Sequence, residues 1–255
     1  MYKFALLTPS RERPQSVERL LQSLSDTTTN PSQVEILFAI DNDDSVTREL
    51  LNLLLGTNKY SRLIIKPFYR DRAEMMNRDY YNWLAEKSNS EFIWAIGDDI
   101  VFLVSNWDTI IYDKLQQYLS DKPDKIVCAG IKDTTPKPKP SLPQFPCFPL
   151  VSRVAFQQMG FVLHPFIPTW GADYLIYLLY TGANRYLEIA DRDYLHHVSV
   201  HTKTASKDMT AQRVENIFNQ LKMNDLHNID LAVIKTIPPQ VEELKQKIIQ
   251  LGGKI

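Results

Sequence analysis

Cysteine, glycine, net charge and long apolar runs are all scarce in this sequence of 255 residues. Its two cysteines, Cys128 and Cys147, are too few for a disulfide framework, which favours a reducing compartment. The formal net charge of −1 excludes bulk attraction to nucleic acid or acidic membranes, so any phosphate must bind at a local site. The apolar runs, such as FIWAI and LIYLLY, are far shorter than the roughly 20 residues that span a bilayer.

Together these absences predict a cytoplasmic globular protein with no transmembrane segment and no nucleic-acid partner. The opening residues, KFALLTP, also lack the regions of a secretory signal peptide. Hydrophobic residues at 44% and charged residues at 23% are typical of globular domains, and the length suits one large α/β domain or two small ones. Because we find no internal repeat and no clear linker, we expect one compact domain over residues 1–255.

Short apolar runs alternate with amphipathic stretches along the chain. The runs predict strands at residues 4–7, 34–40, 63–67, 92–96, 126–130 and 185–189. Helical periodicity predicts helices at 16–24, 46–55, 72–87, 107–119, 155–159, 173–180, 210–221 and 241–251, the last one started by Pro238 and Pro239. The proline-dense residues 135–149 cannot lie in a central strand, so we expect a stiff loop. The alternation predicts an α/β fold with a mostly parallel central sheet flanked by helices.

Two adjacent carboxylates, Asp98 and Asp99, follow the strand expected at residues 92–96. Ligands of such sheets bind at this end of the strands. Two like charges side by side are costly unless a cation or strong donors compensate them. A divalent ion that bridges diphosphate oxygens would do so. A turn in which one aspartate caps the next helix explains the pair equally well.

The loops after the first and second strands also carry polar side chains. The loop TPSRERP at residues 8–14 contains the guanidinium groups of Arg11 and Arg13, and an arginine fork can bind two diphosphate oxygens at once. The same loop could be a solvated surface turn. Asp41 ends the second strand and can accept hydrogen bonds from ribose hydroxyls or from a base N–H. It could also belong to a cluster that caps the next helix.

The second half of the chain adds one carboxylate and a group of histidines. Asp173 follows Trp170 in PTWGAD, at the start of an expected helix. There it could deprotonate a hydroxyl, or it could be a helix cap beside a core tryptophan. Three of the five histidines lie in LHHVSVH. If residues 194–200 are extended, His197 and His201 share a face, and they are either metal ligands or ordinary polar residues.

The order of these elements resembles the nucleotide-binding half of family 2-type GT-A glycosyltransferases. The series TPSRERPQSVERLLQSL, AIDNDD and RAEMMNRDYYNWLAEKSNSEFIWAIGDDI carries the resemblance over residues 1–105. PTWGAD resembles the W-G-x-E/D element that supplies the base of inverting enzymes, which implies that Asp173 is the base and that Trp170 stacks on a sugar. The usual D-x-D is Gly97-Asp98-Asp99 here, so the first carboxylate is missing and the ligand role falls mainly on Asp99.

The resemblance also assigns roles by position. It implies metal ligation by Asp99 and His197, and donor contacts for Thr8, Asp41, Arg72, Asn77 and Asp98. The guanidinium chemistry of Arg11 makes it a further donor-binding candidate. The implied cofactor is Mn²⁺ or Mg²⁺, and the implied partners are a nucleotide-sugar donor, namely a UDP-sugar, and a carbohydrate or other hydroxyl-bearing acceptor.

The implied reaction is metal-dependent transfer of the sugar to the acceptor hydroxyl with inversion. The chain would divide into a donor half at 1–105, an acceptor and catalytic half at 106–209 and a helical segment at 210–255. Two alternatives stay open. A nucleotidyltransferase usually opens with a glycine-rich loop, and TPSRERP has no glycine. A non-catalytic nucleotide- or carbohydrate-binding module could keep the same fold.

Overall fold

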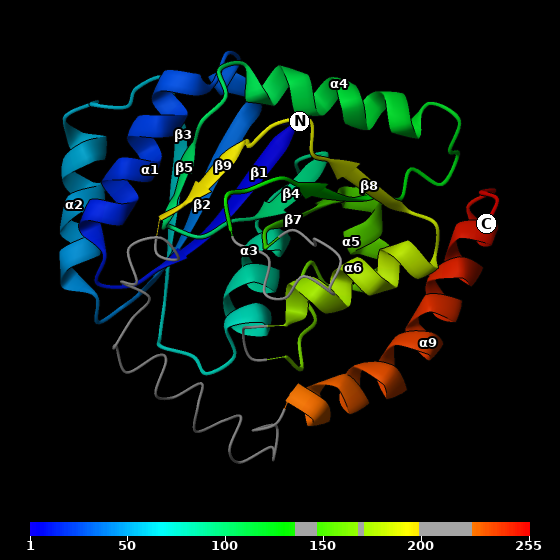
Figure 1. Cartoon of the computed structure of the whole chain (residues 1–255). Helices are drawn as coiled ribbons and strands as arrows, with labels where there is room; N and C mark the ends of the chain where they lie inside the picture. Colours follow the sequence, from blue (N-terminus) through cyan, green and yellow to red (C-terminus); the bar gives the residue numbers. More distant parts are fainter. Residues whose placement is uncertain (136–146, 168–170, 199–225) are drawn as a thin grey trace.

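The apolar runs form a seven-stranded central sheet in the computed structural model, with strand order β3-β2-β1-β4-β7-β6-β8 (Figure 1). The structure describes residues 1–135, 147–167, 171–198 and 226–255, the backbone alone at 226–236. The strands of this sheet are β1 Phe4–Ser10, β2 Val34–Asp41, β3 Ile64–Arg70, β4 Phe92–Ala95, β6 Cys128–Ile131, β7 Pro149–Ser152 and β8 Tyr186–Ile189. All six predicted strands are present, with shifted ends.

The sheet is mostly parallel, as predicted, with one exception. β7 runs antiparallel to both of its neighbours, β4 and β6, whereas the other adjacent pairs are parallel. The sequence did not predict β7 because its four buried residues, PLVS, end a proline-rich stretch and show no alternation of polar and apolar side chains. Proline is acceptable here as the first residue of the strand. As a result, the amino end of β7 lies at the same edge as the carboxyl end of β4.

Helices cover both faces of the sheet, and side chains that alternate along each strand supply the two cores. Phe4 and Leu6 of β1 pack with the layer formed by α1, α2 and α4, while Ala5 and Leu7 pack on the other face. The first layer contains α1 Pro14–Thr27, α2 Ser45–Gly56 and α4 Trp107–Leu119. The second contains α3 Trp83–Glu86, α5 Arg153–Met159, α6 Ala172–Gly182 and α9 Leu226–Gln250 (Figure 1).

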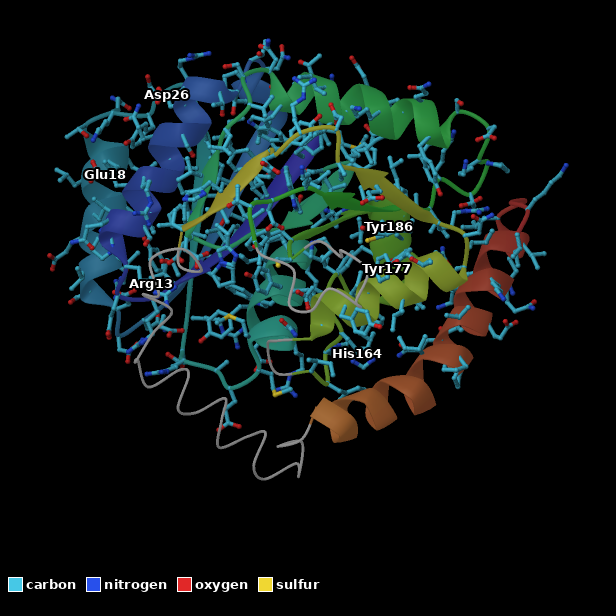
Figure 2. All side chains as sticks on the ribbon, viewed as in Figure 1. Arg13, Glu18, Asp26, His164, Tyr177 and Tyr186 are labelled. Atoms are coloured by element: carbon cyan, nitrogen blue, oxygen red, sulfur yellow. The ribbon has the colours of Figure 1, made fainter. Side chains whose placement is uncertain are left out.

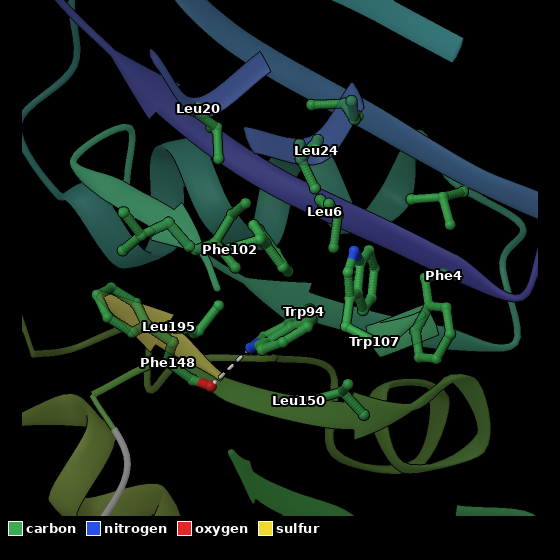
Figure 3. Packing of buried hydrophobic residues seen from close by; sticks show 14 of the residues in the cluster. Phe4, Leu6, Leu20, Leu24, Trp94, Phe102, Trp107, Phe148, Leu150 and Leu195 are labelled. Carbon is green, nitrogen blue, oxygen red and sulfur yellow. Dashed lines mark hydrogen bonds between the residues drawn. The ribbon is translucent and has the colours of Figure 1, made fainter. Parts of the chain in front are cut away.

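Aromatic residues fix the centre of the first core (Figure 3). Trp94 of β4 meets Phe102 and Trp107 edge-on, with ring centroids 5.6 and 5.7 Å apart. Its indole Nε1–H also donates a 2.8 Å hydrogen bond to the carbonyl of Phe148, so the buried indole is satisfied. This bond ties the start of β7 to β4.

A second, two-stranded sheet lies beside α1. β5 Ile100–Phe102 pairs antiparallel with β9 Leu195–His197, and Ile100 is the register partner of His197. The pairing joins residues almost one hundred positions apart in the sequence. It brings the expected histidine segment next to Asp99, which directly precedes β5.

The helix expected at residues 72–87 is the largest departure from prediction. The helix begins at Met76, and its first part, Met76–Asn82 (η2), has π-helical geometry before α3 continues it. Asn77 and Asn82 are five residues apart, so i→i+5 geometry places them close to one face. Their side-chain amides donate to the carbonyls of Ile167 and Leu163, at 2.6 and 2.8 Å. The π-helical part therefore holds the segment that leads to α6.

The C-terminal helix also differs from prediction. α9 extends through Pro238 and Pro239, which lie inside it, so the prediction that they start the helix was wrong. Proline disfavours a helix interior without forbidding it. The helix expected at 210–221 lies outside the described residues. Among the described helices, none combines the length and the apolar character needed to cross a bilayer.

Candidate functional site

The carboxyl ends of β1, β2 and β4 gather most of the predicted site residues at one edge of the sheet. The three strands are adjacent and parallel, so their carboxyl ends lie side by side. Ser10 and Asp41 are the last residues of β1 and β2, and Asp98 follows β4. The loop after β1 lies between the other two and begins α1, where Figure 2 labels Arg13. The side chains of this loop reach to both sides.

On one side, Arg11 binds the acidic residues at the carboxyl end of β2. Its Nη1 lies 2.9 Å from Asp41 Oδ2, and its two terminal nitrogens contact both carboxylate oxygens of Asp43 at 2.5 and 3.0 Å. The hydrogen bonds that Arg11 donates to Asp43 contribute most to raising the pKa of Arg11 above its usual value. Asp41 is buried, and its second oxygen accepts a 2.6 Å hydrogen bond from the hydroxyl of Tyr80. Arg11 and Asp41 therefore form a fixed surface, the floor of the site, between the carboxyl ends of β1 and β2.

On the other side, Arg13 and Ser10 bind Asp98. Ser10 Oγ donates to Asp98 Oδ2 at 2.6 Å, and Arg13 Nη1 lies 3.3 Å from Oδ1. Burial raises the pKa of Asp98 to about 6, although Arg13 and Ser10 act against this. Each carboxylate oxygen of Asp98 thus accepts from one of these two described side chains and keeps capacity to accept another hydrogen bond.

Asp99 and His197 face each other at the same edge. Their Oδ2 and Nε2 atoms are 3.4 Å apart, and each side chain keeps 16% of its surface exposed. The other ring nitrogen of His197, Nδ1, lies 2.9 Å from Thr135 Oγ1. If Nδ1 carries the proton and donates it to Thr135 Oγ1, then Nε2 is unprotonated and its lone pair can bind a metal. The hydrogen-bond partner of one ring nitrogen determines which nitrogen carries the proton.

Gly97 explains the missing first carboxylate of the D-x-D pattern. A Cβ at this position would lie 2.4 Å from Asp99 Oδ1. The Asp99 carboxylate therefore folds back over Gly97 into space that any side chain there would occupy. In this chain, glycine at position 97 and the present orientation of Asp99 depend on each other.

The metal implied by the resemblance would be held by Asp99 and His197. Two ligands that bind one small divalent ion at about 2.1 Å are about 3 Å apart when they are neighbours in octahedral geometry. The separation of 3.4 Å between Oδ2 and Nε2 is close to this. Within the described residues no third His, Cys, Asp or Glu completes a cluster. The pair fits an ion whose other positions are taken by diphosphate oxygens and water, as is usual for Mg²⁺.

Asp173 lies in the first turn of α6. The backbone N–H of Tyr174 donates to its Oδ1 at 2.9 Å. Burial raises the pKa of Asp173 to about 6, backbone hydrogen bonds oppose this, and the charge of Asp133 adds to it. Burial, followed by the charges of Asp133, Asp173 and Asp99, raises the pKa of the Cys147 thiol to about 12. The charges of these three carboxylates therefore all act on Cys147.

The remaining predicted donor-binding residues are placed differently. Thr8 is 0% exposed, and its hydroxyl has no hydrogen-bond partner in the described part of the chain. Arg72 follows β3, half-buried, and its charge helps to lower the pKa of Asp43 after the larger effects of Arg11. Asn77 is buried, and its described bond is to the Ile167 carbonyl. This placement favours a structural role for Asn77. Trp170 and His201 lie outside the described residues.

Several residues at this edge were not predicted. Asp133 follows β6, is buried, and accepts hydrogen bonds from the backbone N–H groups of Thr135 and Cys147. The rule that found Asp41 and Asp98, a carboxylate after a parallel strand, would have found Asp133 too. Nothing in the sequence marked Tyr80 or Thr135, because their contacts depend on the π-helical geometry and on the pairing of β5 with β9.

The chain matches no known protein-family description and no curated protein sequence. Solved structures, in contrast, resemble it over nearly its whole length. One is S. aureus TarS 1–349 in complex with UDP, with a TM-score of 0.59 and 12% identity over 98% of this chain and 87% of that chain. Another is the mannosyltransferase PcManGT from Pyrobaculum calidifontis in complex with GDP-Man and Mn²⁺, with a TM-score of 0.56 and 11% identity over 98% and 86%.

A third similar structure is GalNAc-T7 with UDP, GalNAc and Mn²⁺, with a TM-score of 0.55 and 15% identity over 77% of this chain and 44% of that chain. The likenesses show that the chain has the GT-A fold of glycosyltransferases. The mixed sheet flanked by helices agrees with the predicted fold class.

Proposed function

We propose that this protein is a metal-dependent glycosyltransferase that moves a sugar from a nucleotide-diphosphate sugar to an acceptor hydroxyl with inversion. The observation that carries the proposal is the 3.4 Å separation of Asp99 and His197 beside the end of β4, in a chain with the GT-A fold. A pair of ligands for a hard cation and a half-buried carboxylate with a raised pKa, Asp173, are the two parts that such a reaction needs.

The donor would bind over the floor formed by the first two strand ends. Asp41 would accept a hydrogen bond from the base or ribose, and Arg11 would hold it in place through the 2.9 Å contact. Asp98 would accept from the ribose with its remaining lone pairs, and Arg72 would face the diphosphate. Thr8 lies beneath this surface, so its proposed contact with the base requires the neighbouring groups to move.

Asp99 and His197 would hold Mn²⁺ or Mg²⁺, of which Mn²⁺ tolerates the imidazole better. When bound, the ion would supply positive charge that stabilises the departing diphosphate. Asp173 would take the proton from the acceptor hydroxyl as its oxygen forms a bond to the anomeric carbon. The bond from that carbon to the diphosphate oxygen breaks, and the leaving group keeps the electron pair. Attack opposite the leaving group inverts the anomeric centre.

The nucleotide of the donor is proposed to be UDP, and the similar structures contain either UDP or a GDP-sugar. TarS and GalNAc-T7 carry UDP, whereas PcManGT carries GDP-Man. The division into a donor half at 1–105 and an acceptor half at 106–209 stays a prediction.

The proposal is tested by offering the purified protein a panel of UDP- and GDP-sugars with Mn²⁺, with Mg²⁺ or with EDTA. We expect release of one nucleoside diphosphate that depends on the metal and becomes faster with an acceptor. Tight binding of a nucleotide-sugar without any release, with and without carbohydrate acceptors, would instead identify a non-catalytic binding module. Release of pyrophosphate from a nucleoside triphosphate and a sugar phosphate would identify a nucleotidyltransferase.

A further inference from the structure

Glu12 has an unusual backbone conformation in the middle of the loop that reaches both sides of the candidate site. Its φ angle is +55°, in the left-handed region. A residue other than glycine is disfavoured there by a factor of about 5–30. Its two neighbours, Arg11 and Arg13, bind carboxylates at the ends of different strands, Asp41 as the last residue of β2 and Asp98 after β4. The conformation of Glu12 therefore determines how both guanidinium groups are directed.

Asp44 holds Glu12 in this conformation. Its Oδ2 accepts a 2.8 Å hydrogen bond from the backbone N–H of Glu12. Its Oδ1 accepts a 3.0 Å bond from the backbone N–H of Thr47, which caps the start of α2. Asp44 is 1% exposed, so both bonds are shielded from water. One buried carboxylate thus fixes the loop after β1 to the helix after β2.

We propose that Asp44 is a positioning residue for nucleotide-diphosphate binding. It contacts no substrate, and it acts by keeping Glu12 left-handed so that Arg11 and Arg13 stay on opposite sides of the donor site. This inference rests on the function proposed above. Loss of Asp44 would release the loop into the common right-handed or extended region, and both arginines would then lose their partners.

The simpler interpretation is that Asp44 only caps α2. Substitutions at positions 44 and 12 distinguish this capping role from the proposed positioning role. Glycine at position 12 adopts a positive φ without the steric cost of a Cβ. If the role of Asp44 is to hold Glu12, then Glu12→Gly should restore the binding that Asp44→Ala loses. A role limited to capping α2 gives no such rescue. The ion pair between Glu12 and Arg11 is a small loss, because the Glu12 carboxylate is 64% exposed.

Ser152 offers a matched control. Its Oγ caps α5 by accepting from the backbone N–H of Ala155, and it is 3% exposed, so Ser152→Ala removes a buried cap far along the chain from this loop. We expect Ser152→Ala to lower Tm and to leave the affinity for UDP and GDP unchanged. This control separates a loss of stability from a loss of positioning.

The experiment measures the Kd of UDP and GDP with Mn²⁺ by calorimetry, and Tm, for the parent, Asp44→Ala, Glu12→Gly, Asp44→Ala with Glu12→Gly, and Ser152→Ala. We expect Asp44→Ala to weaken binding about 5–30-fold and the double variant to regain most of it. Equal affinities for Asp44→Ala and the double variant, or parent affinity in Asp44→Ala, overturn the proposal.

If the parent binds neither nucleotide, the proposed function fails, and the Tm values still test Asp44. Glu12→Gly should then raise Tm less in the Asp44→Ala background than in the parent, because without Asp44 the loop has already left the left-handed conformation whose steric cost glycine removes. Equal effects of Glu12→Gly in both backgrounds overturn the role of Asp44.

Discussion

The hydroxyl of Thr135 lies 2.9 Å from Nδ1 of His197, and this contact turns the opposite ring nitrogen toward Asp99. Thr135 follows β6 and His197 ends β9, so two segments far apart in the sequence orient one imidazole. In metal sites a partner on the second nitrogen fixes both the tautomer and the ring orientation.

Asp99→Ala should abolish the dependence of nucleoside-diphosphate binding on Mn²⁺ while the protein stays folded, because it removes the one carboxylate ligand of the proposed site. Thr135→Val should weaken the same Mn²⁺-dependent binding about 10–100-fold, the usual range for residues that orient metal ligands. Calorimetry with Mn²⁺ and with EDTA measures both. Asp121→Ala, which removes an exposed carboxylate beside Lys122, is the control. Mn²⁺-dependent binding that survives in Asp99→Ala would exclude this metal site.

Gly97→Ala should displace the Asp99 carboxylate, because the new Cβ would lie 2.4 Å from Oδ1. The atom that must move is the end of a side chain, so we expect Tm to change little and Mn²⁺-dependent binding to weaken about 10–100-fold. Gly56→Ala is the matched control, since a Cβ there meets nothing within 4 Å. Parent-like Mn²⁺ binding by Gly97→Ala would show that Asp99 is not a ligand in this orientation.

Asp173→Asn should lower the rate of transfer about 10²–10⁴-fold, the range for loss of a general base, and leave donor binding near normal. Because the pKa of Asp173 is raised to about 6, kcat of the parent at saturating donor should fall as pH drops through about 6. A base must be deprotonated to accept a proton. Full turnover by Asp173→Asn would show that Asp173 is not the general base and has only a structural role at the start of α6.

The same substitution should affect stability with a defined pH dependence. The folded-state pKa of Asp173 is above the ordinary value of 3.8, so its stabilising effect is complete below that value and is lost as pH rises through about 6. Above pH 6 the charge of the half-buried Asp173 carboxylate destabilises the folded state, and Asn removes that charge. We therefore expect Asp173→Asn to raise Tm more at pH 8 than at pH 4, as measured by thermal unfolding. A constant difference across this range contradicts the assignment.

A buried ion pair far from the candidate site provides a stability prediction. Arg185 Nε and Nη2 bind the two oxygens of Asp124 at 3.0 and 2.9 Å, and both side chains are almost completely buried. Removal of one partner leaves an uncompensated buried charge, so Asp124→Ala should cost about 3–5 kcal/mol. Denaturant unfolding should show this loss, while the Kd for nucleoside diphosphate stays at the parent value. A cost below about 1 kcal/mol would mean that water reaches the pair.

The sequence predicted the parts of the site that depend on local signals. Asp41 and Asp98 were found because each follows an apolar strand, and Asp173 because it precedes a helical period. Only the resemblance implied that Asp99 and His197 lie together, because their contact depends on pairing of two three-residue strands, too short to give a periodic signal. The order of the sheet was also hidden, because β7 is a four-residue antiparallel strand at the end of a proline-rich stretch.

The two asparagine anchors of the π-helical part, Asn77 and Asn82, are five residues apart. In an α-helix a spacing of four residues would place two side chains on the same face, so the π-helical part contains one additional residue between its anchors. The additional residue allows two adjacent tyrosines to fit between the anchors. Tyr80 reaches Asp41 at the end of β2, and Tyr81 reaches the carbonyl of Ile96 after β4, at 2.6 and 3.0 Å. Deletion of either tyrosine would relax the turn to ordinary α-helical winding with both anchors kept. The shortened helix could then support only one of the two strand ends.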